Sequence, residues 1–232
     1  MPTSVAKSVT IDAGKASRVS GLLSLPAGAS AAYVFAHGAG AGMSHSFMEA
    51  AAAGLAERGI ASLRYQFMYM EKGSKRPDPP ALAHAVVRAA VAYAAEHLPG
   101  LPLIAGGKSF GGRMTSQAQA AAPLPGVRGL AFFGFPLHAS GKPSADRGDH
   151  LKQVEIPMLF LQGEKDKLAE LSLLEPLVKG LGKRATLCVL PAADHSFHVP
   201  VRSGRTDAET LAAALDAFAA WCKPISASRT RA

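Results

Sequence analysis

Short apolar runs alternate with helix-length segments along most of this chain, and this alternation limits its possible folds more than any other feature. Each run has the length of a β-strand and is apolar at nearly every position, not at every second one. The runs are AAYVFA (31–36), IASLRY (60–65), LPLIAG (101–106), VRGLAFFGF (127–135), PMLFLQ (157–162) and ATLCVL (185–190). The helix-length segments are Phe47–Arg58, Pro80–His97, Gly112–Ala121, Leu168–Gly180 and Asp207–Cys222. Strands of this kind are covered on both faces, so the pattern predicts an α/β fold with a mostly parallel, twisted sheet and helices on both faces.

The amino-terminal segment has a different pattern. Its runs Val5–Ile11 and Val19–Leu25 alternate loosely and end at turn residues, which predicts an antiparallel hairpin. With these two runs the sheet has about seven or eight strands. A length of 232 residues fits a single domain, which we place at residues 1–223. Asp207 is predicted to cap the last helix, and residues 224–232, which lack periodicity, are predicted to be a frayed tail.

The strongest chemical signal is Gly107-x-Ser109-x-Gly111, which follows one predicted strand and precedes one predicted helix. This is the context of a nucleophile elbow, where a serine sits on a sharp and strained turn. Side chains two residues before or after the serine would collide with neighbouring backbone, and glycine removes them. A phosphate-binding loop ending at Ser109 is disfavoured, because its first glycine would have to stand where the chain has Pro102.

A nucleophilic serine also needs a base and an acid. Asp166 follows the run PMLFLQ, and His195 follows the run ATLCVL, so both stand directly after predicted strands. The order serine, acid, histidine is that of the α/β-hydrolases. We therefore predict Ser109 as nucleophile, His195 as base and Asp166 as the carboxylate that fixes the imidazole tautomer. Glu164 is an alternative acid and His198 an alternative base.

The glycine-rich loop after the run AAYVFA is the candidate for the rest of an oxyanion hole. One backbone N–H would come from Phe110, and the second from Gly38 or Ala39, of which Ala39 is preferred. His37 is expected to brace this loop. A dinucleotide-binding motif does not fit the same glycines. The acidic and histidine residues near position 195 lack a recognised metal-ligand spacing, so neither a metal nor another cofactor is expected.

Five sequence blocks together resemble a known family. They are similar to the small α/β-hydrolases that include testis-expressed protein 30 and the hydrolase-like region of an NSL chromatin-complex subunit, and more distantly to dienelactone hydrolases. The blocks are AHGAGAGM (36–43), YMEKGSKRPDPP (69–80), GGKSFGGRM (106–114), LQGEKD (161–166) and ADHSFHV (193–199). The resemblance implies an α/β-hydrolase fold with Ser109, Asp166 and His195 as the triad. It implies no substrate, and dienelactone hydrolases have cysteine where this chain has Ser109.

Two loops are expected to shape the pocket. Only 20 residues, Leu137–Ile156, separate one predicted strand from the next where many α/β-hydrolases insert a lid, so no lid domain is expected. The loop at residues 66–80 should lie at the carboxyl edge of the sheet. There Met68, Tyr69 and Met70 offer an apolar wall for substrate, and Lys72, Lys75 and Arg76 offer positive charge for a carboxylate. The alternative is an exposed basic loop with no role in substrate binding.

Composition excludes some other classes of protein. The formal net charge is +8, but the basic residues are scattered and few aromatic residues lie near them, so no nucleic-acid partner is expected. No membrane span is expected. The first residues resemble no secretory signal, which favours a cytoplasmic protein. We expect either a monomer or a homodimer. The expected activity is hydrolysis of a small carboxylic ester, or else a thioester or amide. The alternative is a non-catalytic interaction module of the same fold.

Overall fold

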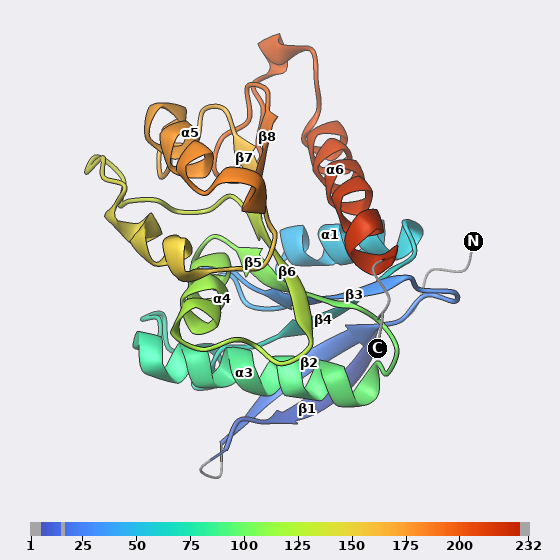
Figure 1. Ribbon diagram of the computed structural model, residues 1–232. Helices are drawn as coiled ribbons and strands as arrows, with labels where there is room; N and C mark the ends of the chain where they lie inside the picture. Colours follow the sequence, from blue (N-terminus) through green and yellow to red (C-terminus); the bar gives the residue numbers. More distant parts are fainter. Residues whose placement is uncertain (1–5, 15–16, 228–232) are drawn as a thin grey trace.

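The computed structural model describes residues 6–14 and 17–227, and a sheet of eight strands lies at its centre (Figure 1). The strand order is β1-β2-β4-β3-β5-β6-β7-β8. The strands are β1 (Lys7–Asp12), β2 (Arg18–Ser24), β3 (Ala31–Ala36), β4 (Ile60–Tyr65), β5 (Leu103–Lys108), β6 (Val127–Phe133), β7 (Met158–Gly163) and β8 (Ala185–Leu190). The helices are α1 (Ser46–Glu57), α2 (Met68–Glu71), α3 (Pro80–His97), α4 (Phe110–Ala121), α5 (Leu171–Gly180) and α6 (Asp207–Ala227), with short 3-10 helices η1 (Asp146–Gln153), η2 (Gly182–Arg184) and η3 (Val201–Ser203).

The pairing of the strands confirms the predicted α/β-hydrolase architecture. Strand β1 pairs antiparallel with β2, and β2 pairs antiparallel with β4, whereas the pairs from β4 through β8 are parallel. Val5, where the predicted hairpin begins, lies outside the described residues. Parallel strands bring their carboxyl ends to one edge of the sheet, so the loops after β3, β5, β7 and β8 begin close together.

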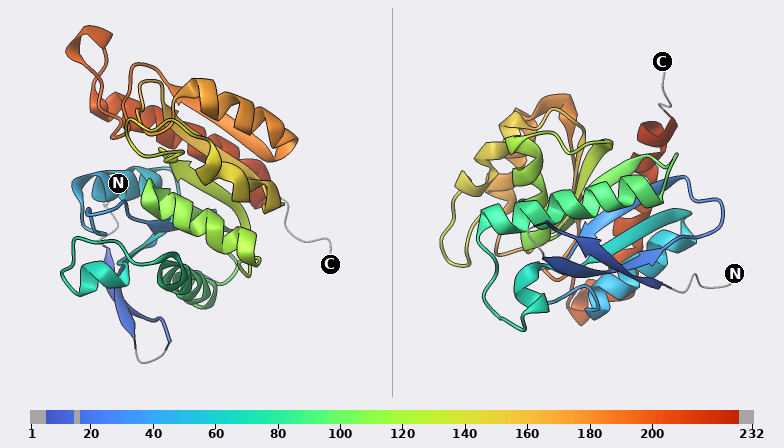
Figure 2. Two further views of the ribbon diagram at one scale, coloured as in Figure 1. Left: turned by 90° about the vertical axis from the view of Figure 1, so that its left-hand side faces the viewer. Right: turned by 90° about the horizontal axis from the view of Figure 1, so that it is seen from below.

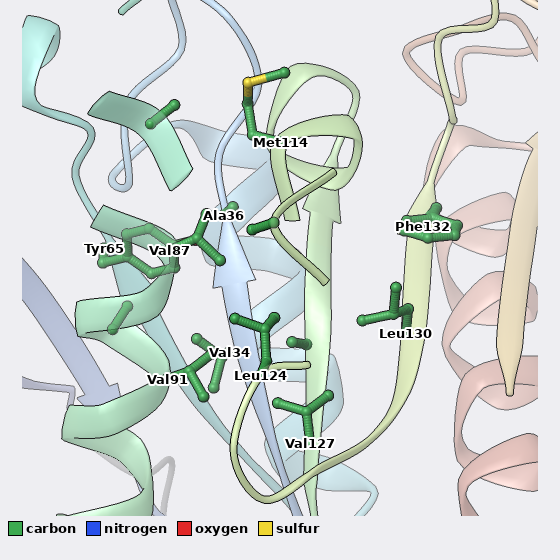
Figure 3. Close-up of a cluster of buried hydrophobic side chains, with 14 of the residues drawn as sticks. Val34, Ala36, Tyr65, Val87, Val91, Met114, Leu124, Val127, Leu130 and Phe132 are labelled. Carbon is green, nitrogen blue, oxygen red and sulfur yellow. The ribbon is translucent and has the colours of Figure 1, made fainter. Parts of the chain in front are cut away.

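Helices cover both faces of the sheet, as the apolar strands required. Helices α1 and α6 lie on one face, and α3, α4 and α5 lie on the other (Figures 1 and 2). Val87 and Val91 of α3 point at the sheet, where Val34 of β3 is buried beneath them (Figure 3). No helix within the described residues is long and apolar enough to cross a membrane.

The segment between β6 and β7 contains no lid domain. Within Leu137–Ile156 the chain forms a two-residue bridge, Ala139 with Lys142, and then the 3-10 helix η1. Helix η1 packs beside α4 through a contact between His150 Nε2 and Ser116 Oγ, which are 2.7 Å apart. The carboxyl edge of the sheet is therefore left open above Ser109.

The last helix differs from the prediction at both ends. Thr206, not Asp207, caps it: the backbone N–H of Glu209 donates to Thr206 Oγ1 at 3.2 Å, and Glu209 Oε2 accepts from the N–H of Thr206 at 2.8 Å. The helix also continues through Pro224 to Ala227. It does so because Ile225 packs against the core, and this contact offsets the backbone hydrogen bond that a proline cannot make. Residues 228–232 of the predicted tail lie outside the described residues.

Candidate active site

Ser109 occupies a sharp turn between strand β5 and helix α4. Its φ is 50° and its ψ is −116°, a conformation that costs a residue with a side chain of the order of 1–3 kcal/mol. A Cβ on Gly107 would lie 2.4 Å from the carbonyl oxygen of Ala36, and one on Gly111 would lie 2.6 Å from the same atom. Close backbone packing therefore requires glycine at both positions, as predicted from the sequence.

A continuous hydrogen-bonded chain runs from Ser109 to a buried carboxylate. Ser109 Oγ lies 2.8 Å from His195 Nε2, and His195 Nδ1 lies 2.6 Å from Asp166 Oδ2. The three residues come from the loops after β5, β7 and β8, which are not adjacent in sequence. With the ring proton on Nδ1, held by Asp166, Nε2 is free to accept the proton of Ser109.

Asp166 is 2% exposed, and its carboxylate accepts three hydrogen bonds. Besides His195, its Oδ2 accepts from Gln162 Nε2 at 2.5 Å, and its Oδ1 accepts from the backbone N–H of Leu168 at 2.7 Å. Gln162 is itself fully buried, and its Oε1 accepts from the N–H of Phe135 at 2.9 Å. The sequence did not point to Gln162, because this residue ends a buried apolar run and belongs to no recognised catalytic motif.

The two alternatives to these residues lie elsewhere. Glu164 is half-buried on the turn after β7, where its carboxylate accepts hydrogen bonds from Lys165 Nζ and from the backbone N–H of Ala192. His198 forms an exposed ion pair with Asp207 at 2.9 Å and does not contact Ser109. Among the residues that the structure describes, no group of three acidic, histidine or cysteine side chains is arranged to hold a metal ion.

The predicted oxyanion donors lie around Ser109. Phe110 is the first residue of α4, so its N–H is among those that a helix cannot pair internally. Ala39 lines the space next to Ser109, and a Cβ on Gly38 would lie 3.8 Å from the Cβ of Ser109. His37 holds this loop in place, because its Nδ1 donates to Gly38 O at 2.7 Å and its Nε2 accepts from Phe67 N–H at 3.1 Å. Burial lowers the pKa of His37 to about 4, which leaves the ring neutral for this arrangement.

Two cavities meet at Ser109. One, of about 390 Å³, is bordered by Phe47, Met48 and His195. The other, of about 370 Å³, is bordered by Phe110, Arg113, Met114 and Arg147 and does not reach His195. Ala39, Ser109 and Leu168 border both. Two compartments on either side of a nucleophile suit the two halves of a substrate.

The residues predicted to bind substrate lie apart from both cavities. Tyr69 and Lys72 line a neighbouring hollow of about 430 Å³ instead. The Tyr69 hydroxyl accepts from the N–H of Gly40 at 2.9 Å, so this residue braces the glycine-rich loop. Met70 packs beneath the same loop, with its Cε 3.2 Å from where a Cβ of Gly42 would stand. The cations that do border the Ser109 cavities are Lys108, Arg113 and Arg147.

Lys108 is a second functional candidate that the sequence analysis passed over. Its ammonium donates to the carbonyl oxygen of His195 and lies 4.7 Å from the centre of the Phe197 ring. Burial lowers the pKa of Lys108 to about 8, against the opposing effect of the Asp166 and Asp194 carboxylates. This contact ties β5 to the histidine loop beside the nucleophile. The signal was present, since Lys108 stands next to Ser109 in the elbow motif.

Comparison with known proteins shows the family of this chain. A family model described as the alpha/beta hydrolase domain matches residues 29–223. The chain belongs to the α/β-hydrolase family. No curated protein matches the sequence.

Solved α/β-hydrolases share the fold of this one over nearly its whole length. The dienelactone hydrolase of Anabaena variabilis has 22% identity and a TM-score of 0.75, covering 94% of this chain and 97% of its own. A lidless serine hydrolase of Xanthomonas campestris, XC6422, has 21% identity and a TM-score of 0.70, covering 94% and 96%. Est1E of Butyrivibrio proteoclasticus has 16% identity and a TM-score of 0.72, covering 95% and 99%. At these identities the likeness concerns the fold.

Proposed function

We propose that this α/β-hydrolase is a serine esterase, which cleaves small carboxylic esters through an acyl-Ser109 intermediate. The observation that carries the proposal is the chain of hydrogen bonds from Ser109 Oγ through His195 to Asp166. A nucleophile on a strained turn, with a base 2.8 Å away and a buried acid behind it, suits acyl transfer. We further propose that the chain belongs with the testis-expressed protein 30 group, because each of the five resembling blocks contributes a residue to this site or its neighbouring hollow.

The first half of the reaction transfers the acyl group to the enzyme. Ser109 Oγ attacks the ester carbonyl carbon while its proton passes to His195 Nε2. The resulting oxyanion accepts hydrogen bonds from the N–H groups of Phe110 and Ala39. As the carbon–oxygen bond to the leaving group breaks, the proton on Nε2 moves to the departing oxygen, and an alcohol leaves.

The second half returns the enzyme to its starting state. A water molecule attacks the acyl carbon and gives its proton to His195 Nε2. The ester bond to Ser109 then breaks, and the proton passes from Nε2 to Ser109 Oγ, so that a carboxylic acid is released. Throughout, Asp166 holds Nδ1–H and stabilises the imidazolium that forms in each half.

The test compares wild type with Ser109→Ala on 4-nitrophenyl acetate and 4-nitrophenyl butyrate. We expect wild-type turnover, and a loss of kcat of at least ~10³-fold in the variant, because binding and oxyanion stabilisation alone remain. Ser172→Ala, an exposed serine on α5, is the matched control and should keep wild-type activity. A folded wild type without turnover of either ester would favour the alternative of a non-catalytic interaction module. Undiminished turnover by Ser109→Ala would remove Ser109 from the reaction.

A further inference from the structure

The cavity that does not reach His195 contains two guanidinium groups. Arg113 comes from the end of the first turn of α4, four residues after Ser109, and Arg147 comes from η1. Both border the same space as Ser109. Arg113 also lies over the Phe110 ring, with its guanidinium carbon 5.9 Å from the ring centre. Two cations thus share one cavity of about 370 Å³ next to the nucleophile.

Helix α4 and the 3-10 helix η1, which carry these arginines, contact each other through residues three positions after each arginine. Ser116 stands three residues after Arg113, and His150 stands three residues after Arg147. Residues three apart lie on one side of an α-helix and of a 3-10 helix alike, so the 2.7 Å contact between Ser116 and His150 places the two arginines opposite each other. Burial, and secondarily the charge of Arg113, lower the pKa of His150 to about 4, so this histidine is a neutral link that adds no cation.

Neither arginine has an anionic partner among the described residues. No carboxylate there lies within 4.0 Å of either guanidinium. The Nε atom of Arg113 is buried and has no hydrogen-bond partner. Burial, and secondarily the charge of Arg147, lower the pKa of Arg113. The one carboxylate that borders the cavity, Asp78, accepts from the N–H of Tyr69 at 3.0 Å. Two close, half-buried cations without a counter-ion are costly unless a ligand supplies the negative charge.

The position of His195 indicates which half of a substrate enters this cavity. In the proposed reaction His195 protonates the leaving group, so the leaving group must lie on the side that His195 borders, next to Phe47 and Met48. The acyl group then extends to the other side, past Phe110 towards the two arginines. Lys108 also borders the leaving-group side, but its ammonium already donates to the carbonyl oxygen of His195. The acyl side holds two guanidinium groups without an anionic partner, so a negatively charged acyl group fits that compartment.

We propose that Arg113 and Arg147 bind a carboxylate at the far end of the acyl group, so that the substrate is a half ester of a short dicarboxylic acid. The proposal rests on the esterase function proposed above and names the substrate class for the same site. Paired guanidinium groups match a carboxylate geometrically and can give it several charge-assisted hydrogen bonds. This subsite replaces the one expected at Lys72, which lies outside both cavities.

The first test needs no variant. It compares 4-nitrophenyl hydrogen glutarate with 4-nitrophenyl pentanoate, and the hydrogen adipate with the hexanoate, each pair equal in carbon number. We expect wild-type kcat/KM to be roughly 10-fold to 100-fold higher for the charged member of at least one pair, after subtraction of spontaneous hydrolysis. A third pair, 4-carboxyphenyl and 4-carbamoylphenyl pentanoate, moves the charge to the leaving group, and there we expect no preference for the anion. Equal rates within both acyl pairs, or a preference only for the charged leaving group, would overturn the proposal.

The second test removes the cations one at a time. In Arg147→Gln and Arg113→Gln the ratio of charged to neutral kcat/KM should fall by roughly 10-fold or more, mainly through KM. Arg202→Gln removes the same charge from an exposed residue of η3 and should leave the ratio unchanged. An unchanged ratio in both cavity variants would contradict the assignment. If wild type hydrolyses none of these esters, the esterase function itself fails, and this outcome is distinct from hydrolysis without charge preference.

Discussion

Replacing Asp166 with asparagine tests whether Asp166 fixes the tautomer of His195. The change keeps the shape of the side chain, but replaces an oxygen that only accepts hydrogen bonds by an NH₂ group that only donates. Asp166 faces three donors: His195 Nδ1, Gln162 Nε2 and the N–H of Leu168. An asparagine can satisfy Leu168 with its carbonyl oxygen, and its NH₂ group then faces the other two.

The substitution Asp166→Asn changes which nitrogen of the His195 ring carries the proton. Next to an NH₂ group, Nδ1 must become an acceptor, so the ring proton moves to Nε2. His195 then has no lone pair with which to take the proton of Ser109, although the 2.8 Å spacing to Oγ is kept. We expect kcat/KM for 4-nitrophenyl butyrate to fall by ~10³- to 10⁴-fold, which is about 4–5 kcal/mol of transition-state stabilisation.

Gln162 cannot relieve the conflict by turning its amide, because its Oε1 already accepts from the N–H of Phe135. We therefore expect the free energy of unfolding to fall as well, by about 1–3 kcal/mol for one unsatisfied buried donor. Stopped-flow kinetics and urea denaturation measure the two effects separately. Glu164→Gln is the matched control, because that carboxylate lies on the same turn but is directed at Lys165 and Ala192. If folded Asp166→Asn keeps more than about a tenth of the wild-type kcat/KM, the argument from the histidine tautomer is refuted.

Two further predictions concern packing and pH. Gly111→Ala would place a Cβ 2.6 Å from the carbonyl oxygens of Ala36 and His37, so urea denaturation should show that the free energy of unfolding falls by at least about 2 kcal/mol. In the control Gly180→Ala, where a Cβ meets nothing within 4 Å, the free energy of unfolding should stay the same or rise by up to about 1 kcal/mol. Equal effects of the two substitutions would contradict the packing argument. Burial lowers the pKa of Lys108 in the folded state to about 8, below its ordinary value of 10.5, so the unfolded chain binds more protons between those two pH values and stability rises with pH there. The free energy of unfolding of wild type, minus that of Lys108→Met, should therefore rise by roughly 2 kcal/mol from about pH 7.5 to about pH 10, and a flat difference would show that Lys108 is not desolvated.

Much of the fold was predictable because it depends on local patterns. Strand β3 and helix α3 have the predicted bounds, since an uninterrupted apolar run and a proline at the helix start are unambiguous signals. Strand β5 begins two residues later than predicted and extends to Lys108, directly before the serine. The end of α6 was missed because the packing of Ile225 on the core is a tertiary contact, which outweighs the local effect of Pro224.

In the site, too, some residues could be predicted from local sequence patterns and others depend on tertiary contacts. The close approach of Ser109, Asp166 and His195 could be predicted from the sequence, because each lies in the loop after a strand and the carboxyl ends of parallel strands meet at one edge. Lys72 lines a hollow beside the two cavities at Ser109, and the sequence could not show this, because a loop sequence does not indicate which of several neighbouring hollows its side chains border. Arg147 could not be connected with the site at all, since its segment reaches α4 through tertiary contacts such as that between His150 and Ser116.

The central claim is that Ser109 Oγ is the nucleophile, and its covalent capture tests this most directly. A fluorophosphonate is incubated with wild type and with Ser109→Ala, and intact-protein mass spectrometry is followed by peptide mapping. Attack by Oγ on phosphorus with loss of fluoride should add one phosphonyl group to wild type, on the peptide that contains Ser109, and none to the variant. A folded wild type that stays unmodified, or an adduct of equal yield on another residue in both proteins, would contradict the account.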